Sequence, residues 1–367
     1  MSANELTESN PRSHSKSPTV PAISAIDLFS GCGGLSSGLS RAGIRSVAAV
    51  DNWSDALETF EFNHPDAEVI EADLGRGKLT KLMGQLSDSD VVFGGPPCQG
   101  FSISGKRDPD DPRNLLYRGF LSVVSDVRPK LFLMENVPNL ASMDSGSLVA
   151  AIEHDFIDLG YSISRKILLA SDFGVPQNRR RLFIVGTLSD QAFEWPEASS
   201  ISIESKVTCR DAISDLPEQT VSDGSPYPIV ELSDYQRDIR IGSDFIMNHE
   251  ATNHSEQTKK IISLVPDGGN YKDLPQELRD TRKVNIAWTR FNSRKPSPTI
   301  DTGHRHHFHY QFNRVPTVRE SARLQSFPDY FVFKGSKTSQ YRQVGNAVPP
   351  MLAEAIGYSV SKFLAEN

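Results

Sequence analysis

The stretch AIDLFSGCGGLSSGL, residues 25–39, joins an apolar segment to a glycine-rich turn and then to a segment with helical periodicity. A buried strand that passes through glycines into a helix brings backbone amides up to a ligand at the carboxyl edge of a sheet. The spacing differs from the GxGxxG pattern of dinucleotide-binding proteins, because Ser36 occupies the third glycine position. The stretch therefore predicts a ligand site at a strand end, with a dinucleotide pyrophosphate disfavoured.

Outward from this stretch, short apolar segments rich in β-branched residues alternate with helix-period segments as far as about residue 188. Such alternation predicts an α/β fold with a parallel sheet wrapped by helices. The expected strands lie within 24–29, 46–51, 69–74, 89–95, 130–137 and 181–187, and the expected helices within 34–43, 53–63, 115–127 and 147–160.

The alternation stops in the second half of the chain, where Pro, Asp, Ser and Asn are frequent. This change predicts a second, smaller and irregular domain at residues 189–337. The last segment begins with prolines and has a helical pattern, so we expect 338–367 to complete the first domain, 23–188. Residues 1–22 are rich in Ser, Asn and Pro and are expected to form a disordered tail.

The composition limits the cellular compartments in which the protein is expected to work. The tail lacks the apolar stretch of a signal peptide, and no run of the 367 residues approaches the roughly 18 apolar residues of a membrane span. The three cysteines, Cys32, Cys98 and Cys209, form no CxxC pair. We therefore expect a cytoplasmic protein in a reducing environment, with no membrane contact.

Charge is distributed unevenly along a chain whose net charge is −7. Residues 279–342 contain 13 Lys or Arg and 4 Asp or Glu, whereas residues 23–160 contain 11 and 20. A basic segment on an acidic body favours nucleic-acid binding at one face. A solvated basic surface without a partner stays open as the alternative.

Two acidic residues follow strands near the glycine turn. Asp51 ends the second expected strand, 20 residues after Gly31, where a carboxylate accepts hydrogen bonds from ribose hydroxyls. Asp73 ends the third and is placed to accept from an adenine amino group. Together with Gly31 and Gly33 they predict an adenosine pocket. In the alternative, the glycines only cap a helix and the two acids are solvated.

The sequence VVFGGPPCQGFS, residues 91–102, places Cys98 after a strand that ends at the same edge. Pro96 and Pro97 fix the backbone, and the flanking glycines remove bulk, which suits a thiol aimed at a flat substrate. A free cysteine is more often a small buried apolar residue, and that interpretation also stands.

Titratable groups follow the next two expected strands. Glu135 ends the strand at 130–137, where burial would raise its pKa and allow it to act as a general acid. In QNRRRLFIVG, extended backbone places Arg179 and Arg181 on one face and Arg180 on the other. Two guanidinium groups on one face suit a phosphate or a base carbonyl. A strand-end glutamate and a solvated basic stretch are the non-functional alternatives.

At this point the motifs resemble those of a known family. DLFSGCGGLSSGL, GGPPCQGFS, ENV, QNRRRLFIVG, RVPTVRESARLQSFPDYF and QVGNAVPP occur in the order found in the bacterial DNA (cytosine-5)-methyltransferases of restriction-modification systems. The resemblance covers nearly all of residues 24–365. It implies a Rossmann-like S-adenosylmethionine-dependent methyltransferase sheet with a smaller target-recognition domain.

The resemblance also assigns residues. It implies Cys98 as the nucleophile, with Glu135, Arg179 and Arg181 holding the target cytosine. It implies an S-adenosylmethionine site in which Phe29 packs on the adenine, Asp51 binds the ribose and Asp73 binds the adenine edge. The remaining implied cofactor residues are Gly31, Gly33, Gly34, Pro96, Leu116, Asn346 and Val348.

The chemistry of the ring agrees with this assignment. Carbon 5 of cytosine is a weak nucleophile, so a thiolate must first add to carbon 6. The base must leave the duplex for this attack, and we expect the loop at 99–115 to close over the DNA. An RNA cytosine methyltransferase and a catalytically inactive DNA-binding protein are the alternatives.

We also expect a monomer that acts on double-stranded DNA and is functionally paired with a restriction endonuclease. The histidines His304, His306, His307 and His309 are expected to contact phosphate or bases, and no metal is expected there.

Overall fold

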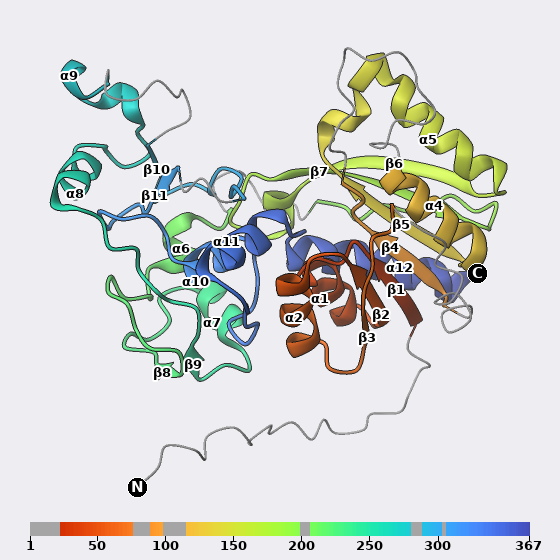
Figure 1. Cartoon of the computed structure of the whole chain (residues 1–367), viewed down its shortest axis with the longest axis horizontal. Helices are drawn as coiled ribbons and strands as arrows, with labels where there is room; N and C mark the ends of the chain where they lie inside the picture. Colours follow the sequence, from red (N-terminus) through yellow and green to blue (C-terminus); the bar gives the residue numbers. More distant parts are fainter. Residues whose placement is uncertain (1–22, 76–88, 98–114, 199–205, 280–287, 303–305) are drawn as a thin grey trace, which may run out of the picture.

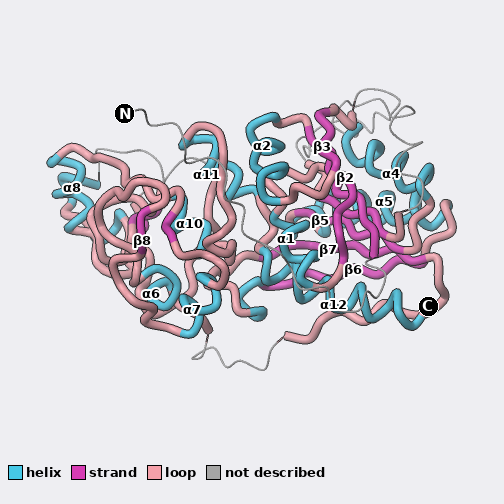
Figure 2. Tube along the Cα trace, turned by 90° about the horizontal axis from the view of Figure 1, so that it is seen from below, coloured by secondary structure: helices cyan, strands magenta, loops and turns pink. Residues whose placement is uncertain are grey.

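The computed structural model describes residues 23–75, 89–97, 115–198, 206–279, 288–302 and 306–367. Two lobes lie side by side in it (Figure 1). The sheet lobe consists of the described residues of 23–198 and of 347–367, and the helical lobe consists of those of 206–346. Figure 2 shows the long strands gathered in one lobe, with short helices and loops in the other.

Seven strands of the described chain form one sheet in the order β3-β2-β1-β4-β5-β7-β6. Their order reverses between β1 and β4, and ligands of open α/β sheets bind at such a switch point. The strands are β1 (Ile23–Leu28), β2 (Ile44–Asp51), β3 (Glu68–Glu71), β4 (Val91–Gly94), β5 (Leu131–Asn136), β6 (Ser162–Leu169) and β7 (Arg180–Thr187). The predicted α/β fold is confirmed.

The predicted parallel sheet has one strand that runs in the opposite direction. β1 to β5 pair in parallel, but β7 is antiparallel to both β5 and β6. The strand β6 was not predicted, because Arg165 and Lys166 obscure its apolar pattern at the edge of the sheet. Because β6 and β7 form a hairpin, β7 starts at the edge where the parallel strands end.

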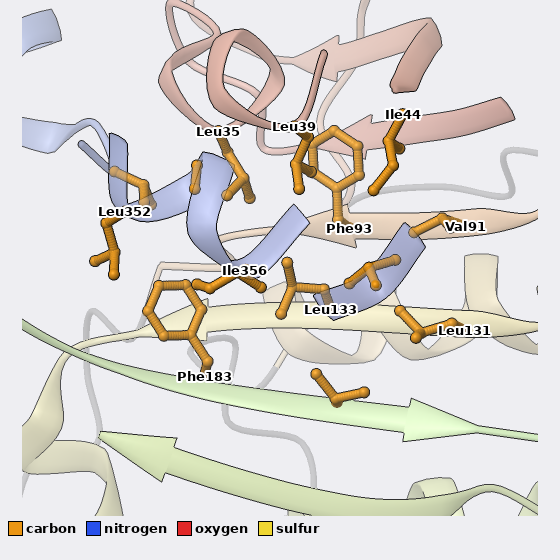
Figure 3. Packing of buried hydrophobic residues seen from close by; sticks show 14 of the residues in the cluster. Leu35, Leu39, Ile44, Val91, Phe93, Leu131, Leu133, Phe183, Leu352 and Ile356 are labelled. Atoms are coloured by element: carbon orange, nitrogen blue, oxygen red, sulfur yellow. The ribbon is translucent and has the colours of Figure 1, made fainter. Parts of the chain in front are cut away.

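Helices cover both faces of the sheet, because successive side chains of a strand point to opposite faces. On one face, Phe93 and Leu133 pack with Leu39 and Ile356 of α1 and α12 (Figure 3). On the other, Phe132 packs in a second cluster with residues of α4 and α5. The helices of this lobe are α1 (Gly34–Arg41), α2 (Ser54–Asn63), α4 (Leu115–Val127), α5 (Ser147–Asp158) and α12 (Pro350–Glu366), with short 3-10 turns at Pro138–Ala141, Met143–Gly146 and Ala170–Phe173.

The helical lobe has short elements joined by long connections. It contains α6 (Cys209–Ile213), α7 (Asp234–Arg240), α8 (Glu256–Ser263), α9 (Gln276–Arg279), α10 (Val318–Leu324), α11 (Lys337–Asn346), a 3-10 turn at Tyr271–Asp273, and the two-residue strands β8 (Ser225–Pro226), β9 (Phe245–Ile246), β10 (Thr289–Arg290) and β11 (His307–Phe308). In the part of the chain that the structure describes, no helix is both long and apolar enough to cross a membrane.

Four arginines of the basic segment 279–342 are buried in the core of this lobe: Arg290, Arg314, Arg319 and Arg323. Arg314 forms a bidentate ion pair with Glu320, with both N–O distances 2.7 Å. Arg323 pairs with Asp329 and Asp215, both also buried. The expectation that this segment supplies phosphate contacts is therefore wrong for these four side chains.

Gly38 allows the close packing of α1 on α12, the helix that follows the QVGNAVPP motif. A Cβ at residue 38 would lie 2.2 Å from the carbonyl oxygen of Pro350 and 2.4 Å from the Cβ of Ala353. We predict that Gly38→Val lowers the free energy of unfolding by about 1–3 kcal/mol or more, because a larger side chain forces the two helices apart. Urea denaturation measures this change.

The matched control is Ser40→Val, which introduces the same side chain on the exposed side of α1. Equal destabilisation by the two variants would show that helix propensity, rather than contact with α12, explains the effect.

Candidate active site

The glycine turn after β1 has the backbone shape that its sequence predicts. Phe29, Gly31 and Gly33 have φ angles of 56°, 52° and 90°, in the left-handed region that glycine adopts most easily. Asp51, at the end of β2, accepts a hydrogen bond from the Gly31 N–H at 2.8 Å and another from the Trp53 N–H at 2.9 Å. Burial raises the pKa of Asp51, and the bonds from backbone N–H groups oppose that shift. Asp51 thus fixes the turn beside it.

Two glycines of the turn are tightly packed. A Cβ on Gly33 would lie 2.8 Å from Nε2 of His64, and one on Gly34 would lie 2.6 Å from the carbonyl oxygen of Val348. Gly33 also caps α1, so the helix-capping alternative describes part of its role. The Val348 side chain belongs to the apolar core. The backbone carbonyl of Val348, and not its side chain, therefore borders the glycine turn.

Asp73 and Leu116 lie near the same edge of the sheet. Asp73 stands two residues beyond the end of β3, and its carboxylate accepts from the Gly75 N–H at 2.9 Å. Leu116 is half-buried at the start of α4, and the backbone of Gly119 in that helix packs against Leu74. The packing of Gly119 brings the first turns of α4 close to Asp73.

Glu135 lies at the same edge as the glycine turn, at the end of β5. Its Oε1 is 2.8 Å from Nε of Arg181, and both side chains are more than four-fifths buried. The two meet because β7 runs antiparallel, so that its first residues lie beside the last residues of β5. Arg180 points to solvent, as the alternation predicts. A Cβ at Gly95 would lie 2.8 Å from Oε2 of Glu135, so the glycine gives the carboxylate room.

Burial and the charges of two arginines act on the pKa of the Glu135 carboxyl group. Burial raises its pKa above the ordinary glutamate value, while the positive charges of Arg181 and Arg179 act in the opposite direction. The raised pKa, with Arg181 bound to one oxygen, describes a group able to donate a proton to a ligand at the other.

Arg179 is 1% exposed and has an incomplete set of hydrogen bonds. Its Nη2 donates to the carbonyl of Gly345 at 2.8 Å and to that of Asn346 at 3.4 Å. Its Nε and Nη1 find no acceptor among the described residues. Burial lowers the pKa of Arg179, and the charge of Arg181 adds to this shift, while Glu135 opposes it. Buried donors without acceptors are costly, so this side chain is suited to a ligand that supplies them.

The predicted nucleophile lies just outside the described residues, as does nearly all of the loop expected to close over DNA. Cys98 directly follows Pro97, the last described residue of its segment. The preceding backbone is anchored, because Nδ2 of Asn136 donates to the Pro96 carbonyl at 3.0 Å. The Asn136 oxygen accepts from the Val137 N–H at 2.8 Å. The ENV motif therefore ties the approach to Cys98 to the end of β5.

Three more residues border the site: Asn346, which was predicted from the sequence, and Arg342 and Trp53, which were not. Asn346 is the exposed last residue of α11, held through its carbonyl by Arg179. The guanidinium of Arg342 lies 4.6 Å from the ring centroid of Trp53, and its charge opposes the burial-driven rise in the pKa of Asp51. A tryptophan two residues after a strand-end aspartate was the available signal, but its partner is 289 positions away in the sequence.

The expected contact of the histidine cluster with DNA is wrong for His309. Its side chain is 0% exposed, and its Nδ1 accepts hydrogen bonds from the N–H groups of Gln311 and Phe312, both at 3.0 Å. His307 stacks on Phe291 with ring centroids 5.3 Å apart. His304 lies outside the described residues. In the described chain, no group of three or more His, Cys, Asp or Glu side chains is arranged to hold a metal ion.

Comparisons with known proteins agree with this geometry. The family model for C-5 cytosine-specific DNA methylases matches residues 23–362. The Type II methyltransferase M1.HphI of Haemophilus parahaemolyticus is 41% identical, over 93% of this chain and 87% of its own length. M.DdeI of Desulfomicrobium norvegicum is 37% identical, over 92% and 88%.

Solved structures show the same fold. A DNA modification methyltransferase encoded within an E. coli prophage superposes with a TM-score of 0.78 at 29% identity, covering 94% of this chain and 99% of that one. The S. pombe Dnmt2 methyltransferase, at 19% identity and a TM-score of 0.57 over 94% and 99%, shares the fold.

The buried histidine gives a pH prediction. Burial lowers the pKa of His309 to about 4, an effect that Glu320 opposes and Arg314 strengthens. Between pH 6.5 and 4 the unfolded chain binds a proton at this position and the folded chain does not, so stability falls as the pH falls. We predict that His309→Asn, which retains an acceptor, removes up to about 1.4 kcal/mol per pH unit from the pH dependence of unfolding.

Urea denaturation of the two proteins at pH 7, 6 and 5 measures that difference, and the other titrating groups cancel in the comparison. Parallel curves for wild type and variant would contradict the assignment.

Proposed function

The chain belongs to the C-5 cytosine-specific DNA methylases. On that premise we propose which of its residues bind the cofactor and the base, and which catalyse the methylation of cytosine in duplex DNA. The enzyme is the modification methyltransferase of a Type II restriction-modification system, as its relatives are named. The observation that carries the assignment is the buried Glu135, bound by Arg181 at the sheet edge that also holds Asp51 and the glycine turn.

The described residues fit S-adenosylmethionine. Both oxygens of Asp51 accept backbone N–H groups, and a carboxylate has about four acceptor sites, so a lone pair remains for a ribose hydroxyl. Asp73 would accept from the adenine amino group, and Phe29, half-buried at the turn, would pack on the ring. When bound, the cofactor supplies an electrophilic methyl group. Pro96, Leu116, Asn346 and Val348 are proposed to complete its pocket.

The proposed reaction begins at Cys98. Its thiolate adds to carbon 6 of the cytosine, and the electron pair of the 5,6 double bond moves toward carbon 5 and the ring. Glu135 donates its proton to ring nitrogen 3, which offsets the charge that develops there. Carbon 5 then takes the methyl group, whose bond to the cofactor sulfur would break with its electron pair left on that sulfur. Loss of the carbon 5 proton to a base, departure of Cys98 as a thiolate and return of the nitrogen 3 proton to Glu135 restore the neutral aromatic ring.

Arg181 and Arg179 are proposed to hold the base. Arg181 is already fixed by Glu135, so it presents its remaining donors in a set orientation. The Nε and Nη1 groups of Arg179 are buried donors that a base carbonyl or a phosphate oxygen would satisfy. Both arginines would thus orient the ring relative to Glu135.

We propose that residues 189–337 form the target-recognition domain. The whole protein would act as a monomer on duplex DNA in the cytoplasm. The exposed basic side chains Arg294 and Lys295 stand close to the base site, because the backbone of Ser297 pairs with Gln177 and Asn178, next to Arg179. A cognate endonuclease and loop closure by 99–115 belong to the same proposal. An RNA substrate is disfavoured by the names of the relatives.

Bisulfite sequencing of a plasmid carrying the gene tests the function and reports the recognition site. We predict protected cytosines at one sequence context with the wild-type protein and none with Cys98→Ser. Glu135→Gln should lower the rate at least about 100-fold, because it cannot donate the proton.

DNA with 5-fluorocytosine at the site should become covalently attached to wild-type protein only. Attachment to the serine variant would remove Cys98 from the mechanism.

Salt dependence tests the phosphate contacts. We predict that the logarithm of the DNA affinity falls linearly with the logarithm of salt concentration, and that the double variant Arg294→Gln, Lys295→Gln reduces the slope by about 2. The control is Arg237→Gln, an exposed arginine of α7 that pairs with Asp234. A salt response unchanged by the double variant would show that this surface does not contact DNA.

A further inference from the structure

The C-terminal end of α11 is capped by side chains from two distant parts of the chain. The last four carbonyls of an α-helix have no partner within the helix. Here Arg179 binds the carbonyls of residues 345 and 346. Nε2 of Gln325 donates to the carbonyls of Val344 at 2.9 Å and Ala347 at 3.0 Å. The four acceptors are therefore satisfied from outside the helix.

A second amide fixes the orientation of Gln325. Its Oε1 accepts from Nε2 of Gln177 at 2.5 Å, and the same nitrogen donates to the Leu324 carbonyl at 3.2 Å. Oε1 of Gln177 accepts from the Ile300 N–H at 3.1 Å. Both glutamines are 0% exposed. Because the oxygen of Gln325 is already bound, its NH₂ group must face α11, and a flipped amide would leave buried groups unpaired.

The segment that Gln325 holds is packed between the two lobes. On one side, a Cβ at Gly34 would lie 2.6 Å from the Val348 carbonyl oxygen and 2.9 Å from the Cβ of Ala347. On the other, a Cβ at Gly345 would lie 2.4 Å from the carbonyl oxygen of Asp301. With so little free space, a shift of residues 344–347 would move the glycine turn.

We propose that Gln325, oriented by Gln177, is a positioning residue for the cofactor pocket. It holds the backbone at 344–347 against the glycine turn, and Gln177, bonded to it, accepts from Ile300 in the segment at 297–302 of the helical lobe. The inference rests on the proposed function, because it takes the glycine turn, Asn346 and Val348 as the walls of the S-adenosylmethionine site. Gln325 acts through the backbone it holds and needs no contact with the cofactor.

The test compares three buried glutamines, each replaced by methionine, which keeps the length and removes the amide. Gln236 is the matched control. It is also 0% exposed, donates to Oγ of Ser214 at 2.9 Å and accepts from the Leu232 N–H at 2.6 Å, but these partners lie in the helical lobe, away from α11. Calorimetric titration with S-adenosylmethionine and thermal unfolding are measured on each full-length protein.

We predict that Gln325→Met weakens cofactor binding about tenfold, because two hydrogen bonds that place the pocket wall are lost. Gln177→Met should weaken binding by a smaller factor, since it frees the orientation of Gln325 and leaves its bonds to α11 possible. Gln236→Met should lower the melting temperature and leave the dissociation constant within about twofold of wild type. In steady state, Gln325→Met should raise KM for the cofactor by a larger factor than it lowers kcat.

Two results would overturn the inference, and they can be told apart. If Gln325→Met and Gln236→Met lower the melting temperature alike and neither changes cofactor affinity, Gln325 is only a stabilising residue. If wild-type protein binds no S-adenosylmethionine, the proposed function fails and the inference with it. Should Gln325→Met not fold, Gln177→Met decides, because unchanged cofactor affinity in that variant contradicts the proposal.

Discussion

A carboxyl group buried beside two guanidinium groups is the interaction on which the rest of this molecule depends. Removing Glu135 from water is costly, and its contact with Arg181 offsets that cost only if the two strands carrying them are held in register. That register, Glu135 opposite Phe183 and Asn136 opposite Leu182, exists because β7 is antiparallel to β5. Because β7 runs opposite to the parallel strands, the two arginines at its start lie beside the end of β5.

Arg179 connects this carboxyl group to the end of α11. The charge of Arg179 opposes the burial-driven rise in the pKa of Glu135, and its guanidinium donates to carbonyls at a helix C-terminus, where the helix dipole favours a positive charge. The same helix end borders the glycine turn through residues 347 and 348. A single buried side chain therefore links the part of the site proposed to hold the base to the part proposed to hold the cofactor, and its replacement would disturb the two together.

The features that depend on the local sequence alone could be predicted from it. The alternation of strands and helices located β1 to β5, the strand ends brought Asp51 to the glycine turn, and extended backbone put Arg179 and Arg181 on one side with Arg180 outside. The direction of β7 could not be predicted without β6, whose charged edge residues concealed it. The burial of Gln177, Gln325 and His309 depends on contacts with segments far away in the chain, which a single sequence does not reveal.

The arginines of the helical lobe show why a basic segment need not be a basic surface. Short helices joined by long connections leave many carbonyls without a partner in a ladder, and an arginine carries five donors with which to satisfy them. Arg290 donates to the carbonyls of residues 262, 265, 309 and 312. Arg319 donates to those of 247, 328 and 331.

Buried carboxylates then balance the charges of this core, as Asp329 and Asp215 do for Arg323. Four of the 13 basic residues that suggested nucleic-acid binding thus stabilise the irregular lobe. The electrostatic contribution to DNA binding must come from the side chains that remain at the surface.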